Sequence, residues 1–316
     1  MSPAISIIVC TMNRADHLRT TLNSMNQLDI PTGMDVEVVV VDNNSTDDTC
    51  EVVRSFGSSP MNVKYVSETR RGLSHARNTG MAHSLGDFLL WTDDDVLLPT
   101  AWISDMVTPL MSGEYHGTGG RVKMSPSLER PWMNRSHFIR LADTRFLPDD
   151  DPAMIGASMA FSRDVLKTIP AFDVDLGAGQ PPAGEDTLFF SQMLVAGLKI
   201  APVPHSIVEH HFSPDRLQYK FWLKNAVHSG LCAAYLDYHW RHKDTTHLRE
   251  REMFWKLALA GFRATRKRQS PEDEGCMRAE LRALGNITQY NSLRHLVSQP
   301  RKYDRLGFVK RTVLSE

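Results

Sequence analysis

One stretch limits the possible fold more than any other: the apolar run Phe88–Trp91 leads through Thr92 into three consecutive aspartates, Asp93–Asp95. Such a run is typical of a buried strand, and bare carboxylates cannot follow it into a core without a compensating partner. We therefore expect the triplet at the carboxyl edge of a sheet, where α/β folds bind ligands. Because adjacent acids repel one another, the triplet predicts a site for Mg²⁺ or Mn²⁺, which would also hold the oxygens of a nucleoside diphosphate.

The first part of the chain alternates between short apolar runs and stretches with helical spacing. Leu18, Leu22 and Met25 recur on one predicted helix face, and Ser45 with Asp48 has the spacing of a capping box that would start a second helix. Strand–helix alternation with short connections is the pattern of a parallel sheet covered on both faces. The strands expected in chain order are 5–10, 36–41, 63–66, 88–92, 118–124, 154–161 and 200–211.

Beyond Phe212 the pattern becomes helical. Aromatic and aliphatic residues recur at helical spacing from Leu217 to Phe262, and such a stripe is by default core that packs against the preceding domain. We place a boundary here, with residues 1–212 as the catalytic domain and residues 213–316 as a helical region that contacts the acceptor or a membrane surface. Before it, the irregular segment 125–151 and the glycine- and proline-rich segment 177–184 are expected to be functional loops.

The net charge of −1 hides a division between these two parts. Residues 1–212 carry 16 Lys and Arg against 26 Asp and Glu, whereas residues 213–316 carry 20 against 11. Such asymmetry indicates an anionic partner for the basic part. No nucleic-acid-binding module is visible, so a membrane surface is the preferred partner. The cluster Arg263, Arg266, Lys267 and Arg268 would make this contact, or it would be a solvated helix end.

Other features point to a cytoplasmic protein, at most peripheral at the inner membrane face. The cysteines lie far apart and form no CxxC pair, which argues against a zinc site or a disulfide framework and fits a reducing compartment. No apolar run approaches the roughly 20 residues that span a bilayer. The N-terminus has no basic segment followed by an apolar one, so no signal peptide is expected.

The motifs become specific through their order along the chain. The first expected strand ends before the loop Thr11-Met12-Asn13-Arg14, and the second ends at Asp42. Arg77-Asn78 follows, within the segment Arg71–Gly80. After it come the aspartate triplet, Gly184-Glu185-Asp186 and His210-His211. This order closely resembles family-two glycosyltransferases with the GT-A fold, over about residues 4–212. The resemblance implies an α/β, Rossmann-like and mostly parallel sheet flanked by helices, followed here by a C-terminal helical extension.

The resemblance also implies how a nucleotide-sugar donor would be held. Asp42 would read the nucleobase, since a carboxylate accepts a hydrogen bond from a pyrimidine N–H; alternatively it caps a turn. Arg14 would meet a phosphate or be solvated, and Arg77 would approach the base or the diphosphate, with Gly80 allowing the helix and the strand to pack closely. The implied donor-binding residues are Thr11, Asn13, Arg14, Asp42, Arg77, Asp93 and Asp94.

By the same resemblance, Asp95 would bind the divalent metal together with a histidine. Neighbouring strand residues point to opposite faces, so only one of His210 and His211 can do so. The pattern His-x-x-Pro followed by Arg-Leu slightly favours His211. The metal would stabilise the charge on the departing nucleoside diphosphate.

The Glu185-Asp186 pair matches the position of the family's catalytic base. Asp186 would accept the proton of the acceptor hydroxyl, and Glu185 would orient the acceptor. The alternative is structural, because acids at a helix start cap free N–H groups and stabilise the helix dipole. That field would also lower the pKa of the carboxylate, unless burial opposes it.

The sequence as a whole predicts an inverting, metal-dependent glycosyltransferase. It would move a sugar from a UDP-sugar, or another nucleoside-diphosphate sugar, to a hydroxyl of a glycan or lipid-linked acceptor in cell-surface glycan synthesis. One alternative is a nucleotidyltransferase that makes the sugar nucleotide, but the loop after the first strand is not the glycine-rich, basic phosphate loop such an enzyme needs. The other alternative is a non-catalytic nucleotide-sugar binding module, which a lost aspartate in either acidic motif would favour; both motifs are intact.

Overall fold

The computed structural model describes residues 5–56, 61–178, 183–265 and 278–311. Within these ranges the chain forms one eight-stranded sheet with strand order β3-β2-β1-β4-β7-β6-β8-β5. Strands β1 to β4, β6 and β8 run in one direction, and β7 and β5 run against them, so the predicted mostly parallel sheet is confirmed. The strands are β1 (Ile5–Thr11), β2 (Val36–Asp42), β3 (Asn62–Ser67), β4 (Phe88–Asp93), β5 (Val96–Leu97), β6 (Gly117–Met124), β7 (Met159–Ser162) and β8 (Ile200–His210).

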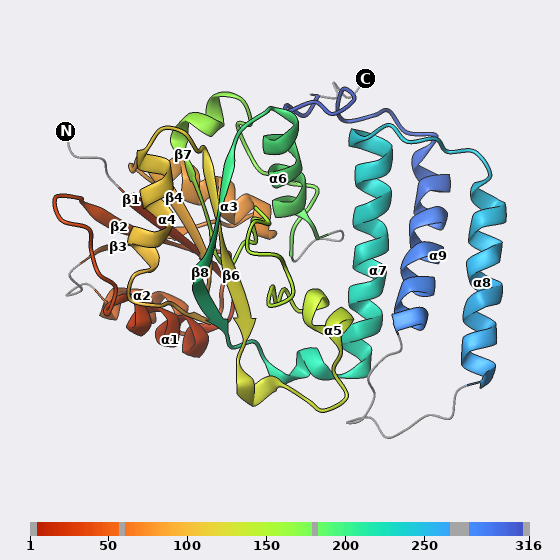
Figure 1. Ribbon diagram of the computed structural model, residues 1–316, viewed down its shortest axis with the longest axis horizontal. Helices are drawn as coiled ribbons and strands as arrows, with labels where there is room; N and C mark the ends of the chain where they lie inside the picture. Colours follow the sequence, from red (N-terminus) through yellow and green to blue (C-terminus); the bar gives the residue numbers. More distant parts are fainter. Residues whose placement is uncertain (1–4, 57–60, 179–182, 266–277, 312–316) are drawn as a thin grey trace.

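Helices cover both faces of this sheet (Figure 1). Alternate strand residues face opposite sides, and Val38 and Val40 accordingly pack with α1, α2 and α4, whereas Val39 and Val41 pack with α3 and α6. The helices are α1 (Ala15–Met25), α2 (Thr49–Ser55), α3 (Leu73–His83), α4 (Trp102–Met111), α5 (Arg135–Arg140), α6 (Glu185–Val195), α7 (Tyr219–Tyr235), α8 (Leu248–Thr265) and α9 (Arg278–Leu296).

Glycine at position 80 lets α3 lie directly on the sheet. A Cβ built there would come 2.5 Å from Cγ2 of Ile8 and 3.2 Å from Cγ2 of Val41. Both side chains are buried and short, so neither can move aside. The predicted role of Gly80 in close helix–strand packing is confirmed.

Two local predictions were wrong. Helix α2 does not start in a capping box, because the Ser45 hydroxyl accepts a hydrogen bond from the Asn13 N–H (2.8 Å) and the helix begins only at Thr49. The segment 125–151 is not wholly irregular either, since it contains α5, which Asn134 caps at its N-terminus. In both places a side chain accepts a hydrogen bond from a backbone N–H. The spacing of residues in the sequence does not show which N–H that side chain will bond.

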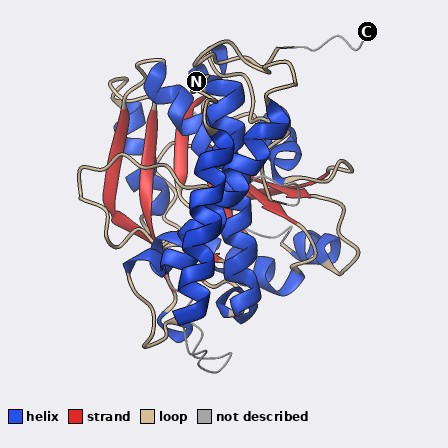
Figure 2. Cartoon of the chain, turned by 90° about the vertical axis from the view of Figure 1, so that its right-hand side faces the viewer, coloured by secondary structure: helices blue, strands red, loops and turns tan. Residues whose placement is uncertain are grey.

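The C-terminal region is a layer of three helices, in which α9 lies between α7 and α8 (Figure 1). In Figure 2, where the right-hand side of Figure 1 faces the viewer, these helices stand in front of the sheet. Helix α7 joins the part of the chain that forms the sheet through two shared hydrophobic clusters. In one, Trp222 packs with Met124, Phe138 and Phe212; in the other, Tyr235 clusters with Leu176 and Leu188. The boundary at residue 212 stays a prediction.

The predicted aromatic stripe is only partly core. Trp222 and Tyr235 on α7 are buried, but Met253, Phe254 and Leu257 on α8 are largely exposed. The expectation that they pack against the catalytic domain was wrong, because α8 contacts α9 and lies at the outer edge of the layer.

No helix within the described ranges is both long and apolar enough to cross a membrane. The cysteines within those ranges, Cys10, Cys50 and Cys232, are free thiols. Of the basic cluster, Arg263 belongs to α8, whereas Arg266, Lys267 and Arg268 lie outside the described residues.

Candidate active site

The carboxyl ends of the central parallel strands bring the acidic motifs together. In the register of the sheet, Thr11 of β1 lies beside Asp42 of β2, and Cys10 lies beside Asp93 of β4. The chain then turns at Asp94 and Asp95 into the short β5. The predicted position of the triplet, at the carboxyl edge of the sheet, is confirmed.

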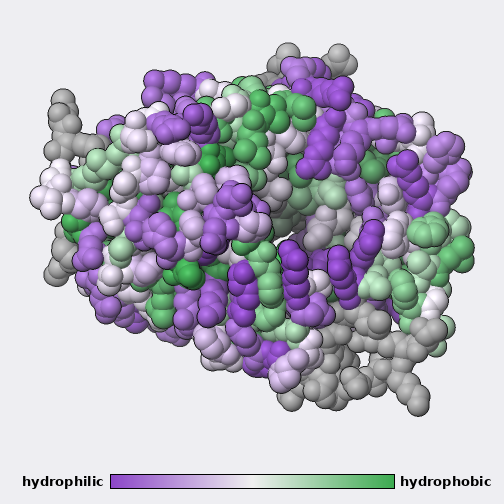
Figure 3. All heavy atoms as spheres, in the orientation of Figure 1, coloured by the Kyte–Doolittle hydropathy of each residue, from purple (hydrophilic) through white to green (hydrophobic). Residues whose placement is uncertain are grey.

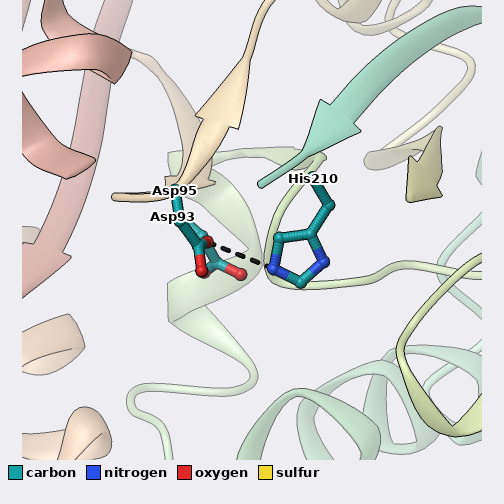
Figure 4. Close-up of side chains that lie close together, drawn as sticks. All are labelled: Asp93, Asp95 and His210. Carbon is teal, nitrogen blue, oxygen red and sulfur yellow. Dashed lines mark ion pairs between the residues drawn. The ribbon is translucent and has the colours of Figure 1, made fainter. Parts of the chain in front are cut away.

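Asp93, Asp95 and His210 form a group suited to a metal ion. One possible ligand atom from each lies within 4.8 Å of the others. The side chains converge from the end of β4, from the turn that follows it and from β8 (Figure 4). His210 is buried with Nε2 3.1 Å from Oδ1 of Asp95, yet neither of its ring nitrogens makes a hydrogen bond of ordinary geometry to a described residue. Two carboxylates and an imidazole without such a partner fit a divalent cation such as Mn²⁺.

His210 occupies this place because of the pairing of β5 with β8. Val96, the residue after the triplet, lies opposite His210 in an antiparallel register. The next residue, His211, points the other way, with Nε2 2.8 Å from Oε1 of Glu209. The slight preference for His211 as the metal ligand is therefore reversed, since the strand gives the inward face to His210.

Arg14 pairs with two carboxylates of the triplet in this structure. Its Nη1 lies 2.6 Å from Oδ1 of Asp94 and its Nη2 lies 2.6 Å from Oδ2 of Asp95, and Arg216 approaches Asp95 at 3.8 Å. The sequence left a phosphate contact and a solvated side chain open for Arg14. In the structure Arg14 is paired with buried carboxylates and is not solvated, because such carboxylates require nearby positive charge; its predicted contact with a phosphate stays a prediction.

The three carboxylates differ in their electrostatics. Burial and the charge of Asp95 raise the pKa of Asp93. Burial raises the pKa of Asp94 to about 7, although Arg14 acts against it. Burial would also raise the pKa of Asp95, but His210 and Arg14 hold it well below its usual range. Asp95 is therefore the carboxylate of the triplet most firmly held in its charged form.

Asp42 is held by the loop that follows β2. Its Oδ1 accepts the Ser45 N–H (2.8 Å) and its Oδ2 accepts the Tyr65 hydroxyl (2.8 Å). Nearby, Asn13 adopts a left-handed φ of 53° and its Oδ1 accepts the Thr46 N–H (2.7 Å). Asp42 thus caps a turn, and its predicted contact with a nucleobase stays a prediction.

Arg77 and Glu185 form a buried ion pair. Nη1 of Arg77 lies 3.0 Å from Oε1 of Glu185, and the guanidinium also lies over the Phe172 ring. Burial alone would lower the pKa of Arg77, but the charges of Glu185, Asp186 and Asp93 raise it. The predicted donor contact of Arg77 stays a prediction, whereas in the structure Arg77 links α3 to the start of α6 through Glu185.

Asp186 lies beside this pair at the start of α6. It is partly exposed; its Oδ2 accepts the Gly156 N–H (3.3 Å) and its Oδ1 accepts the Thr187 N–H (2.6 Å). A Cβ at Gly156 would come 2.1 Å from Nη2 of Arg77, so glycine is needed for this approach. Backbone N–H groups thus hold the partly exposed Asp186 carboxylate at the start of α6, and its predicted role as a general base stays a prediction.

A cavity of about 370 Å³ borders Asp95 on the α1 side. Its lining is mixed, with His17 and Thr20 from α1 facing Leu128 and Phe212. Its volume is at the lower end of the roughly 300–1,000 Å³ of small-molecule sites. It provides space for part of a ligand next to the metal group.

Sequence reasoning did not identify three residues that shape this site. Tyr65 and Gly156 carry no motif. Strand pairing brings Tyr65 to Asp42, and the turn before β7 brings Gly156 to Asp186. Arg216 did have a signal, because it follows the His-x-x-Pro pattern by two residues. That signal was used to choose between the histidines and not to place a cation near Asp95.

Comparisons with known proteins agree with this geometry. The family model described as "Glycosyl transferase family 2" matches residues 6–169. The chain is 27% identical over 264 residues to "Succinoglycan biosynthesis protein ExoM" of Rhizobium meliloti (strain 1021), covering 82% of this chain and 81% of that protein. It is 30% identical over 119 residues to the "GalNAc(5)-diNAcBac-PP-undecaprenol beta-1,3-glucosyltransferase" of Campylobacter jejuni, covering 37% of this chain and 38% of that protein.

A solved structure shows the same fold. The mannosyltransferase PcManGT from Pyrobaculum calidifontis, solved in complex with GDP-Man and Mn²⁺, aligns with a TM-score of 0.57 over 95% of this chain and 76% of that chain. The sequence identity of that alignment is 21%. The likeness shows that the two chains share their fold.

Proposed function

Because the chain belongs to glycosyl transferase family 2, we propose that it moves a sugar from a nucleoside-diphosphate sugar, with a UDP-sugar as the preferred donor, to an acceptor hydroxyl. One observation carries this proposal: Asp93, Asp95 and His210 converge at the carboxyl edge of the sheet. The nucleotidyltransferase and binding-module alternatives are not retained, because the family and the two intact acidic motifs favour a glycosyltransferase.

Asp93, Asp95 and His210 would hold a divalent cation, Mn²⁺ or Mg²⁺, with Asp94 close by. When bound, such an ion supplies Lewis-acid stabilisation of the charge on the departing nucleoside diphosphate. The residues around it bind the donor: Asp42 accepts a hydrogen bond from the base, and Thr11, Asn13 and Arg14 line the same edge. Arg14 already balances the charge of the triplet and lies where it can also contact a phosphate.

Asp186 acts as the general base. It takes the proton of the acceptor hydroxyl as the oxygen attacks the sugar carbon from the side opposite the leaving nucleoside diphosphate, so one displacement inverts that carbon. The Gly156 N–H orients the carboxylate. Glu185 is neutralised by Arg77, and it therefore contributes by fixing the start of α6 beside the acceptor.

The acceptor is proposed to be a glycan or a lipid-linked glycan. Support comes from the relatives, whose names refer to succinoglycan biosynthesis and to an undecaprenol-linked substrate. A cytoplasmic enzyme at the inner membrane face, with its basic C-terminal region toward the lipid, fits such an acceptor.

Replacing the base tests the mechanism. Asp186→Asn is expected to lower transfer by about 10²–10⁴-fold, because the hydroxyl keeps its proton in the transition state. Binding of UDP with Mn²⁺, measured by isothermal titration calorimetry, should stay unchanged. Asp164→Asn is the matched control, since Asp164 is a largely exposed carboxylate far from the edge. Near-normal turnover of Asp186→Asn would eliminate Asp186 as the base.

The cation is tested by binding. The purified chain is first screened for slow hydrolysis of UDP-, dTDP- and GDP-sugars to identify the donor. Titration of the corresponding nucleoside diphosphate with Mn²⁺ and with EDTA then measures metal dependence. Equal affinity in both buffers would remove the proposed role of Asp93, Asp95 and His210.

A further inference from the structure

The outer face of α8 is apolar and exposed. Met253, Phe254 and Leu257 are 56%, 63% and 67% exposed, respectively. Figure 3 shows hydrophobic residues gathered at this outer end of the molecule. The same face continues toward the C-terminus of the helix with small exposed residues, Ala260, Gly261 and Ala264. Soluble proteins seldom leave such a contiguous patch without a partner.

The outer face of α8 does not pack against the rest of the described chain. The half-buried side of α8 carries Trp255 and Phe262, and Arg282 of α9 lies over the Trp255 ring. The exposed residues recur at helical spacing on the opposite side, so α8 is apolar on two faces and only one of them is used for packing. The second face is available to a partner outside the described chain.

Positive charge borders the apolar face. Arg249, Lys256 and Arg263 follow one another at intervals of seven residues, which aligns them along one edge of the helix. Lys256 and Arg263 pair with Glu252 and Glu280, but those glutamates are buried while the two cations are about half exposed. Together α8 and α9 carry seven Arg and Lys against three Glu.

We propose that the outer face of α8 lies on the surface of an anionic lipid bilayer. Met253, Phe254 and Leu257 enter the boundary between headgroups and acyl chains, while Arg249, Lys256 and Arg263 contact lipid phosphates. An apolar stripe with cations at its edge is the arrangement of helices that lie in the plane of a membrane surface.

Charge selects the bilayer over a second copy of this chain. Among the described residues of α8, the exposed acid is Glu250, against four cations. Pairing two α8 faces would bring like-charged edges together with few acids to compensate. The inference rests on the proposed function only in that a lipid-linked acceptor would make membrane contact useful.

Vesicle flotation tests the proposal with the full chain. The protein is mixed with vesicles of phosphatidylglycerol and phosphatidylcholine, or of phosphatidylcholine alone, without donor or acceptor. The wild type should float with the anionic vesicles only, and Phe254→Ser with Leu257→Ser should lower the bound-to-free ratio by on the order of tenfold. Arg249→Gln should lower that ratio about fivefold, and added salt should lower it further.

The matched control is Leu85→Ser with Met111→Ser, which removes two apolar side chains that are 79% and 52% exposed on the catalytic part. This variant should float like the wild type. Absence of flotation, equal flotation on neutral vesicles, or equal loss in the control would overturn the proposal. So would a dimer in light scattering that Phe254→Ser with Leu257→Ser converts to a monomer. Donor hydrolysis is measured separately, so the proposed reaction and the membrane contact can fail independently.

Discussion

The aspartate edge of the sheet and the outer face of α8 depart from ordinary burial in opposite ways. At the edge, charged groups are buried: Asp94 and Asp95 are almost inaccessible and are matched by Arg14. On α8, apolar side chains are exposed and lie beside a row of cations. Both arrangements cost free energy in the isolated chain, and in both of our proposals a ligand offsets that cost.

The difference between the two regions is one of preorganisation. The edge is held by the strand register, by the Arg77–Glu185 pair and by several side-chain hydrogen bonds, as a reaction site must be. The α8 face needs only one helix anchored on α9, because a fluid surface adapts to it. Substitutions at the carboxyl edge of the sheet should therefore change the rate of sugar transfer. Substitutions on the outer face of α8 should change binding to the membrane surface.

The largest predicted effect concerns Asp93. Asp93→Asn should lower transfer by on the order of 100-fold or more, because one ligand of the proposed cation is lost. In EDTA the same variant should be at least as stable as the wild type, since burial and Asp95 already disfavour the charged form of Asp93. Turnover and thermal unfolding in EDTA measure the two effects.

The α8 double variant, Phe254→Ser with Leu257→Ser, is the control from the other region and should keep its transfer to a soluble acceptor. If Asp93→Asn instead unfolded several degrees lower in EDTA, Asp93 would be a structural residue, and the contrast between the two regions would not hold.

A pair of helical glycines provides the second prediction. Gly80→Ala should destabilise the protein by about 1–3 kcal/mol, because the new methyl group meets the buried Ile8 and Val41 side chains. Gly261→Ala on α8 should stabilise it by roughly 0.5–1 kcal/mol, since alanine favours helix and no described atom lies within 4 Å of the new Cβ.

Urea unfolding of the two glycine variants gives the difference directly. A loss of stability in Gly261→Ala similar to that in Gly80→Ala would mean that the outer face of α8 is packed in solution.

The smallest effect is a pH dependence within the C-terminal region. His239 is fully buried, and its Nδ1 accepts the Lys302 N–H (3.3 Å). Burial and the charge of Lys302 lower the pKa of His239 from 6.5 to about 4. The unfolded chain therefore binds a proton between these values that the folded chain does not, and stability should fall as the pH drops from about 6.5 toward 4.

His239→Gln should reduce this loss while keeping an acceptor for the Lys302 N–H. Urea midpoints at pH 7.5 and pH 5 measure the change. An identical pH dependence in wild type and variant would show that His239 does not contribute to it.

Local patterns were sufficient for much of the fold. The valine-rich run before Asp42 and the apolar run before Asp93 are too apolar to lie anywhere but in a core, and both are buried strands. Each of these predictions depends on residues that are neighbours in the chain, where periodicity and sterics act directly.

Predictions that depended on distant partners were less complete. The choice between His210 and His211 was reversed, because the pairing of β5 with β8 decides which histidine faces the triplet. The donor contacts of Arg14 and Arg77 stay predictions, and the sequence did not indicate that these two side chains also pair with Asp94, Asp95 and Glu185. A sequence shows which side chains are charged. It does not show which of these side chains the fold buries next to one another.

The amino-acid sequence by itself determined the strand–helix order, the acidic motifs at strand ends and the division into an acidic and a basic part. These features arise from side-chain periodicity and composition, which act within a few residues. Only the tertiary structure decided that His210 joins Asp93 and Asp95, that Arg77 holds Glu185 and that one face of α8 remains uncovered. Those outcomes depend on strand register and on helix packing across long sequence separations, where one residue of shift exchanges inside for outside.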